Sequence, residues 1–196
     1  MKKAPGSDVG RIVLPAIDGT TFDTATLAGK RYMLSFFRFA SCPFCNMRLH
    51  QLVESSEELG PDFTIVAVFD SPIDNLRRHA TRHSAPFPIL ADERNSYYRE
   101  FAIEHSLRGV VIGMLTRLPT LLKGMFVHGY LPHTVKGSLT TMPADFLIDE
   151  DGVIRVAHYG RDEGDHLPLE TVRAFARQGN RAIGLGNPWP KSDHGR

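Results

Sequence analysis

The chain has 196 residues, of which 42% are hydrophobic, and its 23 lysines and arginines nearly balance 22 aspartates and glutamates. This composition predicts one soluble globular domain over residues 1–196 and lacks the basic excess typical of nucleic-acid-binding proteins. The amino terminus, MKKAPGSDVGRIVLPAIDG, has two lysines but no uninterrupted apolar run behind them. We therefore expect no secretory signal and a cytoplasmic protein.

The first strong pattern joins a strand to a helix. Residues 31–40, RYMLSFFRFA, are rich in aromatic and apolar residues and predict a strand that ends at Ser41. The following SCPFCNMRLHQLVESSEELG predicts a helix, in which Pro43 fits the first turn, and Gly60 followed by Pro61 ends the run. The two cysteines of the chain therefore lie at the start of this helix.

Strand and helix signals alternate through the middle of the chain. DFTIVAVFD (62–70) predicts a buried parallel strand, and the next segment predicts a helix that Ser71 caps and Pro72 opens. FPILAD (87–92) is a third apolar run, and NSYYREFAIEHS (95–106) predicts a short helix. This order predicts an α/β fold with a partly parallel sheet, a mixed sheet flanked by helices.

The stretch 107–137 is apolar, but Arg117, Pro119, Lys123 and several glycines interrupt it. No uncharged run approaches the roughly 18 residues that a membrane-spanning helix needs. We expect an inserted helical hairpin that covers the active site, packs on the core or forms a dimer surface, because the segment would otherwise expose a large apolar patch.

The carboxyl-terminal part reads as a hairpin, a helix and a tail. ADFLIDEDGVIRVAHYG (144–160) predicts two strands joined near Asp151 and Gly152, since Asp-Gly between apolar runs is a strong hairpin signal. PLETVRAFARQ (168–178) predicts a closing helix with one apolar face. The remaining 179–196 is rich in glycine and proline, which predicts an extended tail.

Cys42 and Cys45 are the only cysteines, and the two residues between them make a CxxC motif. In a reducing compartment such a pair indicates catalysis, redox sensing or metal binding rather than a structural disulfide. A thiol at a helix amino terminus faces unpaired N–H groups, which favour the thiolate. Cys42 is placed to react and Cys45, one turn inward, to attack the bond formed there, while Arg38 and Arg48 add nearby positive charge.

Less specific interpretations stay open for these residues. The cysteines could be inert core thiols, or part of a zinc or copper site completed by histidines, although no second CxxC exists. We expect neither a metal nor a cofactor. Arg38 could be a surface charge at the strand end, and RDEGDH (161–166) has the composition of a solvated polar loop.

The arrangement resembles the thioredoxin superfamily, over most of residues 10–178. TTMPADFLIDEDGVI resembles the segment in which that superfamily keeps a proline with a cis peptide bond before a core strand. The resemblance implies a thioredoxin-like fold and gives the cis-proline role to Pro143, with Met142 before it close to the two sulfurs. Backbone groups exposed there would pair with an extended substrate segment.

Within that superfamily, LPAIDGTTFDTATLAGKRYMLSFF and DGVIR resemble the peroxiredoxin-like proteins of the alkyl hydroperoxide reductase and thiol-specific antioxidant (AhpC/TSA) group. The Pro-x-x-x-Thr/Ser-x-x-Cys signature of true peroxiredoxins is not met at either Cys42 or Cys45. The arginine that holds the reactive thiolate in that group has His166 in its place, with Arg161 nearby; these two are candidate thiolate-stabilising residues.

Three hypotheses share the reactive Cys42. In the first, which we favour, a thiol-disulfide oxidoreductase uses Cys45 as resolving thiol and Met142, Pro143 and Arg38 to position its substrate. In the second, a thiol peroxidase reduces hydroperoxides through a sulfenic acid. In the third, a non-catalytic redox sensor or binding module uses the same scaffold. We expect a thiol, disulfide or hydroperoxide substrate, an unidentified reductant, no membrane partner and a possible homodimer.

Overall fold

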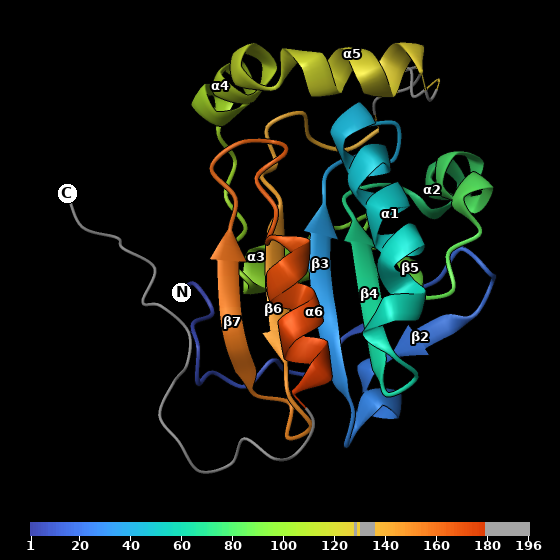
Figure 1. Cartoon of the computed structure of the whole chain (residues 1–196), viewed down its shortest axis with the longest axis vertical. Helices are drawn as coiled ribbons and strands as arrows, with labels where there is room; N and C mark the ends of the chain where they lie inside the picture. Colours follow the sequence, from blue (N-terminus) through green and yellow to red (C-terminus); the bar gives the residue numbers. More distant parts are fainter. Residues whose placement is uncertain (128, 130–135, 179–196) are drawn as a thin grey trace.

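A five-stranded mixed sheet, in the order β5-β4-β3-β6-β7, forms the centre of the computed structural model, which describes residues 1–127, 129 and 136–178 (Figure 1). Strands β3, β4 and β5 run parallel to one another, and β6 pairs antiparallel with both of its neighbours, β3 and β7. This confirms the predicted mixed α/β fold. The strands are β1 (Val13–Pro15), β2 (Thr21–Asp23), β3 (Arg31–Phe37), β4 (Phe63–Phe69), β5 (Ile89–Ala91), β6 (Ala144–Ile148) and β7 (Ile154–Tyr159). The helices are α1 (Pro43–Ser55), α2 (Ile73–Ala80), α3 (Ser96–Glu100), α4 (Leu107–Thr116), α5 (Leu118–Phe126) and α6 (Leu169–Arg177), with short 3-10 turns at Thr24–Leu27, Ser56–Leu59 and Thr81–His83.

Two hydrophobic clusters hold the layers together, one on each face of the sheet. Successive side chains of a strand point to opposite faces, so Phe37 packs toward α1 and α6 while Phe36 packs toward α3. The Phe37 ring stacks on Phe69 at 4.7 Å, and the Phe36 ring meets Tyr98 edge to face at 5.1 Å. Each fully buried aromatic ring of this kind contributes about 1.5–3 kcal/mol of hydrophobic stabilisation.

The candidate site lies at the carboxyl ends of the parallel strands. Strand β3 ends at Phe37, and α1 begins a few residues later, so the cysteines lie between them. In open α/β sheets, ligands bind beyond the carboxyl ends of the parallel strands. The carboxyl ends of the parallel strands, at the top of Figure 1, therefore form the candidate functional end of the sheet.

Helix α3 is shorter than the predicted helix 95–106. It ends at Glu100, and Ala102 then adopts a left-handed conformation with φ of 50°. A residue with positive φ cannot continue a right-handed helix. The apolar Phe101 and Ile103 that extended the helical pattern are instead buried at this turn.

The segment 107–137 forms two helices, as predicted, but not the predicted hairpin. Only Arg117 separates α4 from α5, and the helices follow one another across the top of the molecule, where α5 contacts α1 (Figure 1). Pro119, in the first turn of α5, suits a new helix start and disfavours a continuous helix. Residues 128 and 130–135 of this stretch lie outside the described residues.

The segment leaves and re-enters the domain at one point, which we call the neck. His105 and Thr141 form an isolated antiparallel bridge, and the Ser106 N–H donates to the Thr140 carbonyl at 2.7 Å. The Met142 N–H also donates to the Glu104 carbonyl at 2.8 Å. The two ends of 107–139 are therefore held side by side.

The predicted strand pair at 144–160 is present as β6 and β7, with a turn in which Gly152 has φ of 76°. The closing helix is α6, and the predicted tail 179–196 lies outside the described residues. Within the described part of the chain, no helix combines the length and apolar character needed to cross a membrane.

Candidate active site

Cys42 and Cys45 lie at the junction of β3 and α1, as the sequence predicts. Cys42 is the residue that caps α1, Pro43 occupies the first helical position, and the Asn46 N–H donates to the Cys42 carbonyl at 3.0 Å. Both cysteines are free thiols, and each is only 1% exposed. Their side chains lie within hydrogen-bonding reach of each other. The two sulfurs thus lie close together and are covered from solvent.

The surroundings make the two thiols unequal. Burial opposes ionisation of Cys42, but a hydrogen bond from Cys45, the charge of Arg38 and the N–H groups of Cys45 and Phe44 together lower its pKa from 9.0 to about 7. Burial and the neighbouring Cys42 thiolate raise the pKa of Cys45. Because the thiolate is the nucleophile, this difference in pKa favours Cys42 over Cys45 as the more reactive sulfur.

Arg38 is not a surface charge at the strand end but a buried guanidinium beside the sulfur. Its Nη1 lies 3.8 Å from Cys42 Sγ, and its Nη2 donates to the Leu139 carbonyl. Only 3% of the residue is exposed. The chain just before the second segment of the neck therefore fixes the direction in which the guanidinium points.

Glu163 is a site residue that the sequence did not single out. It is 2% exposed, and its Oε1 lies 3.9 Å from Arg38 Nη1, while its Oε2 has no hydrogen-bond partner among the described residues. Burial raises the pKa of this carboxyl. Helix α4 closes over it at Gly113, where a Cβ atom would lie 2.2 Å from Oε2. Cys42, Arg38 and Glu163 thus form one buried polar group.

Met142 and Pro143 lie at the start of β6, but the described chain has no cis peptide bond, so the predicted cis-proline is wrong. The Met142 N–H already donates to Glu104, and the Pro143 carbonyl accepts from the Gly160 N–H at 2.8 Å. These internal partners stabilise the extended trans backbone. They also occupy groups that an extended substrate segment would need.

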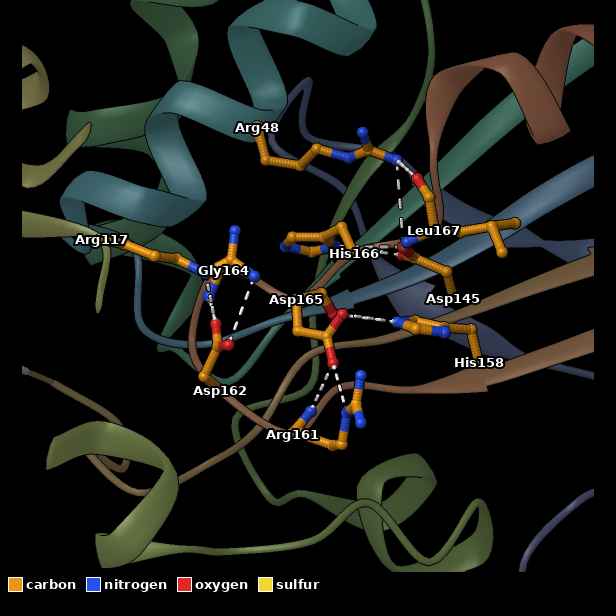
Figure 2. Close-up of polar contacts among 10 residues, drawn as sticks. All are labelled: Arg48, Arg117, Asp145, His158, Arg161, Asp162, Gly164, Asp165, His166 and Leu167. Atoms are coloured by element: carbon orange, nitrogen blue, oxygen red, sulfur yellow. Dashed lines mark hydrogen bonds and ion pairs between the residues drawn. The ribbon is translucent and has the colours of Figure 1, made fainter. Parts of the chain in front are cut away.

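The loop 161–166 is an ordered network rather than a solvated loop (Figure 2). Asp162 pairs with Arg117 at 2.7 Å, and Asp165 accepts from the Arg161 backbone N–H at 2.9 Å and lies 3.2 Å from His158 Nε2. The Arg161 side chain is 92% exposed and points to Asp165. Its described contacts are thus with a carboxylate and not with Cys42.

A second network surrounds Asp145, whose side chain is fully buried (Figure 2). Ser35 Oγ donates to it at 2.5 Å, the Leu167 N–H donates at 2.7 Å, and His166 Nδ1 lies at 3.1 Å. Burial opposes ionisation, but contacts with His166, Arg48 and Ser35 hold the pKa of Asp145 well below its usual range. The His166 imidazole and the Arg48 guanidinium, expected near the sulfur, instead contact this carboxylate.

Asn46 fixes the loop that carries Cys42. Its side-chain amide donates to the carbonyls of Ala40 and Cys42 at 2.8 and 2.9 Å, and its Oδ1 lies 2.8 Å from His83 Nε2.

Among the described residues, no group of three or more His, Cys, Asp or Glu side chains is arranged to hold a metal ion.

A profile of the AhpC/TSA family matches residues 5–157, whereas the sequence matches no curated protein. Many solved structures share the fold, and three of them illustrate the range. Peroxidoxin BcpB from Mycobacterium tuberculosis has a TM-score of 0.63 and 16% identity over 89% of this chain and 97% of its own. Peroxiredoxin 6 of Arenicola marina has a TM-score of 0.65 and 12% identity over 87% and 71%.

A putative thiol:disulfide interchange protein DsbE from Chlorobium tepidum has a TM-score of 0.57 and 16% identity over 89% of this chain and 99% of its own. These TM-scores establish the shared fold, and the profile match covers most of the chain and includes both cysteines. The protein with the Cys42–Cys45 dithiol is a member of the AhpC/TSA family.

Proposed function

We propose that the protein is a thiol peroxidase in which Cys42 reduces a hydroperoxide and Cys45 resolves the product. The observation that carries the proposal is the buried Arg38 guanidinium, 3.8 Å from Cys42 Sγ. Cleavage of an O–O bond needs donors aimed at the oxygen that develops negative charge. Arg38 supplies such donors where the peroxiredoxin signature would supply a hydroxyl.

This proposal reverses the order of the two leading hypotheses from the sequence. A thiol that is 1% exposed favours a slender electrophile over a folded protein disulfide, which must bring its own sulfur to Cys42. The Met142 N–H and the Pro143 carbonyl already have partners inside the protein. Both observations disfavour a partner protein docked beside the sulfurs.

The chemistry balances with the residues present and one external reductant. The Cys42 thiolate attacks the distal peroxide oxygen, an S–O bond forms as the O–O bond breaks, and the leaving alkoxide takes a proton. Glu163, whose carboxyl lies 3.9 Å from Arg38 Nη1, is the candidate acid for that proton. The Cys45 thiol then condenses with the sulfenic acid, which releases water and leaves a disulfide. A dithiol reductant restores both thiols.

Thiol-disulfide exchange is the second candidate, and the CxxC spacing favours it. The deciding experiment is stopped-flow oxidation of the reduced protein by hydrogen peroxide and by cumene hydroperoxide, compared with reduction of a model protein disulfide. We expect hydroperoxides to react faster, Cys42→Ser to abolish the reaction, and Cys45→Ser to leave the first step but stop disulfide formation.

Arg38→Met, set against Arg161→Met as a control at an exposed position, tests the role of the guanidinium. We expect Arg38→Met alone to slow the peroxide step by about a hundredfold, in the range found for loss of one oxyanion donor. Faster reaction with the protein disulfide would favour exchange. No reaction with either oxidant, together with a redox-dependent change in self-association, would favour the sensor hypothesis.

A further inference from the structure

Among the residues that the structure describes, most of the exposed large hydrophobic side chains belong to one segment, 107–139. Among the described residues, twelve large hydrophobic side chains are exposed, and ten of them lie between 107 and 139. We call this surface, formed by the outward sides of α4, α5 and Leu139, the apolar cap. Its most exposed members include Leu107, Leu115 and Phe126, at 74%, 75% and 78%. Contiguous apolar patches of this kind mark interaction sites.

The charges of this segment all have one sign. From residue 105 to residue 144 the sequence contains no aspartate or glutamate, but it contains four arginines and lysines. Arg117 is paired with Asp162, whereas Arg108 and Lys136 are exposed. An apolar surface flanked by cations is complementary to a surface that is apolar inside and anionic at its rim.

We propose that the apolar cap binds the surface of an anionic lipid bilayer. Short helices that expose apolar and basic side chains lie in the interface of a membrane, and the basic residues add attraction to anionic headgroups. Helices α4 and α5 have ten and nine residues, too few to span a bilayer. This proposal replaces the expectation of no membrane partner with attachment at the membrane surface.

The charge pattern favours lipid over a second copy of the chain. A two-fold dimer through the apolar cap would bring the same patch of each copy together. Arg108 and Lys136 of one copy would then face the same cations of the other, and the segment offers no carboxylate to pair with them. Anionic lipid provides the missing negative charge.

The inner side of the cap fixes which side faces outward. Gly109 of α4 packs so closely on the core that a Cβ atom would lie 2.7 Å from the Arg161 carbonyl and from Met142 Sδ. Gly113 packs in the same way on Glu163. The glycines thus seat α4 on the domain, and its large apolar side chains point away from it.

Cosedimentation with vesicles tests the proposal without any use of redox activity, so its outcome is independent of the proposed peroxidase function. The probes are vesicles of phosphatidylcholine alone and of phosphatidylcholine mixed with phosphatidylglycerol, each at low and high salt. We expect the full-length protein to bind the anionic vesicles, and high salt to weaken this binding.

Leu115→Glu should weaken vesicle binding by at least about fivefold and Arg108→Glu by about thirtyfold, since each juxtamembrane charge is worth about 1 kcal/mol and Arg108→Glu changes the charge by two. The matched controls are Val13→Glu and Lys30→Glu, which alter exposed residues outside the cap and should bind as the wild type does. Circular dichroism and the alkylation rate of Cys42 show whether each variant is folded.

Absence of binding to anionic vesicles would overturn the proposal, as would equal binding by the folded cap variants and the wild type. Sedimentation velocity provides a further check. A concentration-dependent dimer that Leu115→Glu dissociates, together with no vesicle binding, would assign the cap to a second copy instead.

Discussion

At the scale of single residues, the reactivity of Cys42 depends on a charge that lies four positions earlier in the chain. The Arg38 guanidinium lies 3.8 Å from Sγ and helps to lower the pKa of Cys42 to about 7. The alkylation rate with iodoacetamide should therefore rise as pH increases through about 7, because the thiolate forms there. Arg38→Met should move this midpoint upward by about one unit, a charge effect of ordinary size, and Arg38→Lys should move it less.

Arg161→Met is the control for this titration, because that side chain is exposed and contacts Asp165. An unchanged midpoint in Arg38→Met would show that the helix-terminal N–H groups and Cys45 suffice to ionise Cys42. Mass spectrometry of the alkylated protein, with Cys45→Ser as a second background, confirms which sulfur has reacted.

Glu163 gives a second prediction at this scale. Glu163→Gln keeps the size of the side chain but removes the candidate acid of the site, a carboxyl that is 2% exposed and lies beside Arg38. We expect the peroxide step to slow by about tenfold to a hundredfold, with the larger loss for hydroperoxides whose alcohols are poorer leaving groups. Stopped-flow rates over a series of hydroperoxides measure this dependence. A uniform loss across the series would indicate a positioning role through Arg38 instead.

At the scale of secondary structure elements, α4 packs directly on Met142 and Glu163, two residues of the candidate site. Gly109→Ala adds one methyl group where a Cβ atom lies 2.7 Å from a backbone carbonyl, which cannot move as a side chain can. We expect α4 to shift outward and the reaction of Cys42 with a bulky aromatic disulfide reagent to accelerate, with less change for hydrogen peroxide.

Thr116→Ala, at an exposed position of the same helix, is the matched control. It removes only a hydrogen bond from Oγ1 to the Ile112 carbonyl and should leave both rates unchanged. An equal acceleration in the two variants would attribute the effect to helix stability rather than to the contact at Gly109.

Local sequence patterns predicted most elements because their causes are local. The run 31–40 and the Pro43 that follows it set a strand and a helix start within one stretch of chain. The geometry of 107–126 could not be predicted in the same way. A break at Arg117 is compatible with either a hairpin or two successive helices. In the structure the helices are successive, and α5 packs on α1, an element distant in the sequence.

The site shows the same division between local and distant causes. Cys42 and Cys45 were predictable because the motif and the helix start lie within four residues. The contact between Arg38 and Glu163 joins residues more than a hundred positions apart, and the charged run 161–166 that contains Glu163 reads as a loop. His166, the predicted thiolate partner, instead contacts the Asp145 carboxylate. This contact depends on the pairing of β6 with β3, which positions Asp145 in the sheet.

At the scale of the whole molecule, His83 links stability to pH. Burial, together with the charges of Arg82 and His50, lowers its pKa from 6.5 to about 4. Below pH 6.5 the unfolded chain binds a proton that the folded protein binds only near pH 4. The free energy of unfolding should therefore fall as pH decreases from 6.5 to 4, by about 3 kcal/mol at most from this residue.

Urea unfolding followed by circular dichroism at several pH values measures this effect. In His83→Gln the amide can still donate to Asn46 Oδ1. The free energy of unfolding of this variant should depend less on pH between 6.5 and 4, and it should differ from the wild-type value less at pH 8 than at pH 4. An equally steep loss in the variant would place the proton uptake at other groups.

The neck at 104–106 and 140–142 has a consequence for how this protein could be divided and recombined. Because the chain enters and leaves 107–139 through adjacent hydrogen-bonded residues, a two- or three-residue turn could replace the whole segment without stretching the sheet, and loop closure would cost less with the shorter connection. Segment 107–139 is therefore a separable insertion in the fold. Exchanging this segment between relatives would transfer the proposed membrane-binding surface while leaving the dithiol in place.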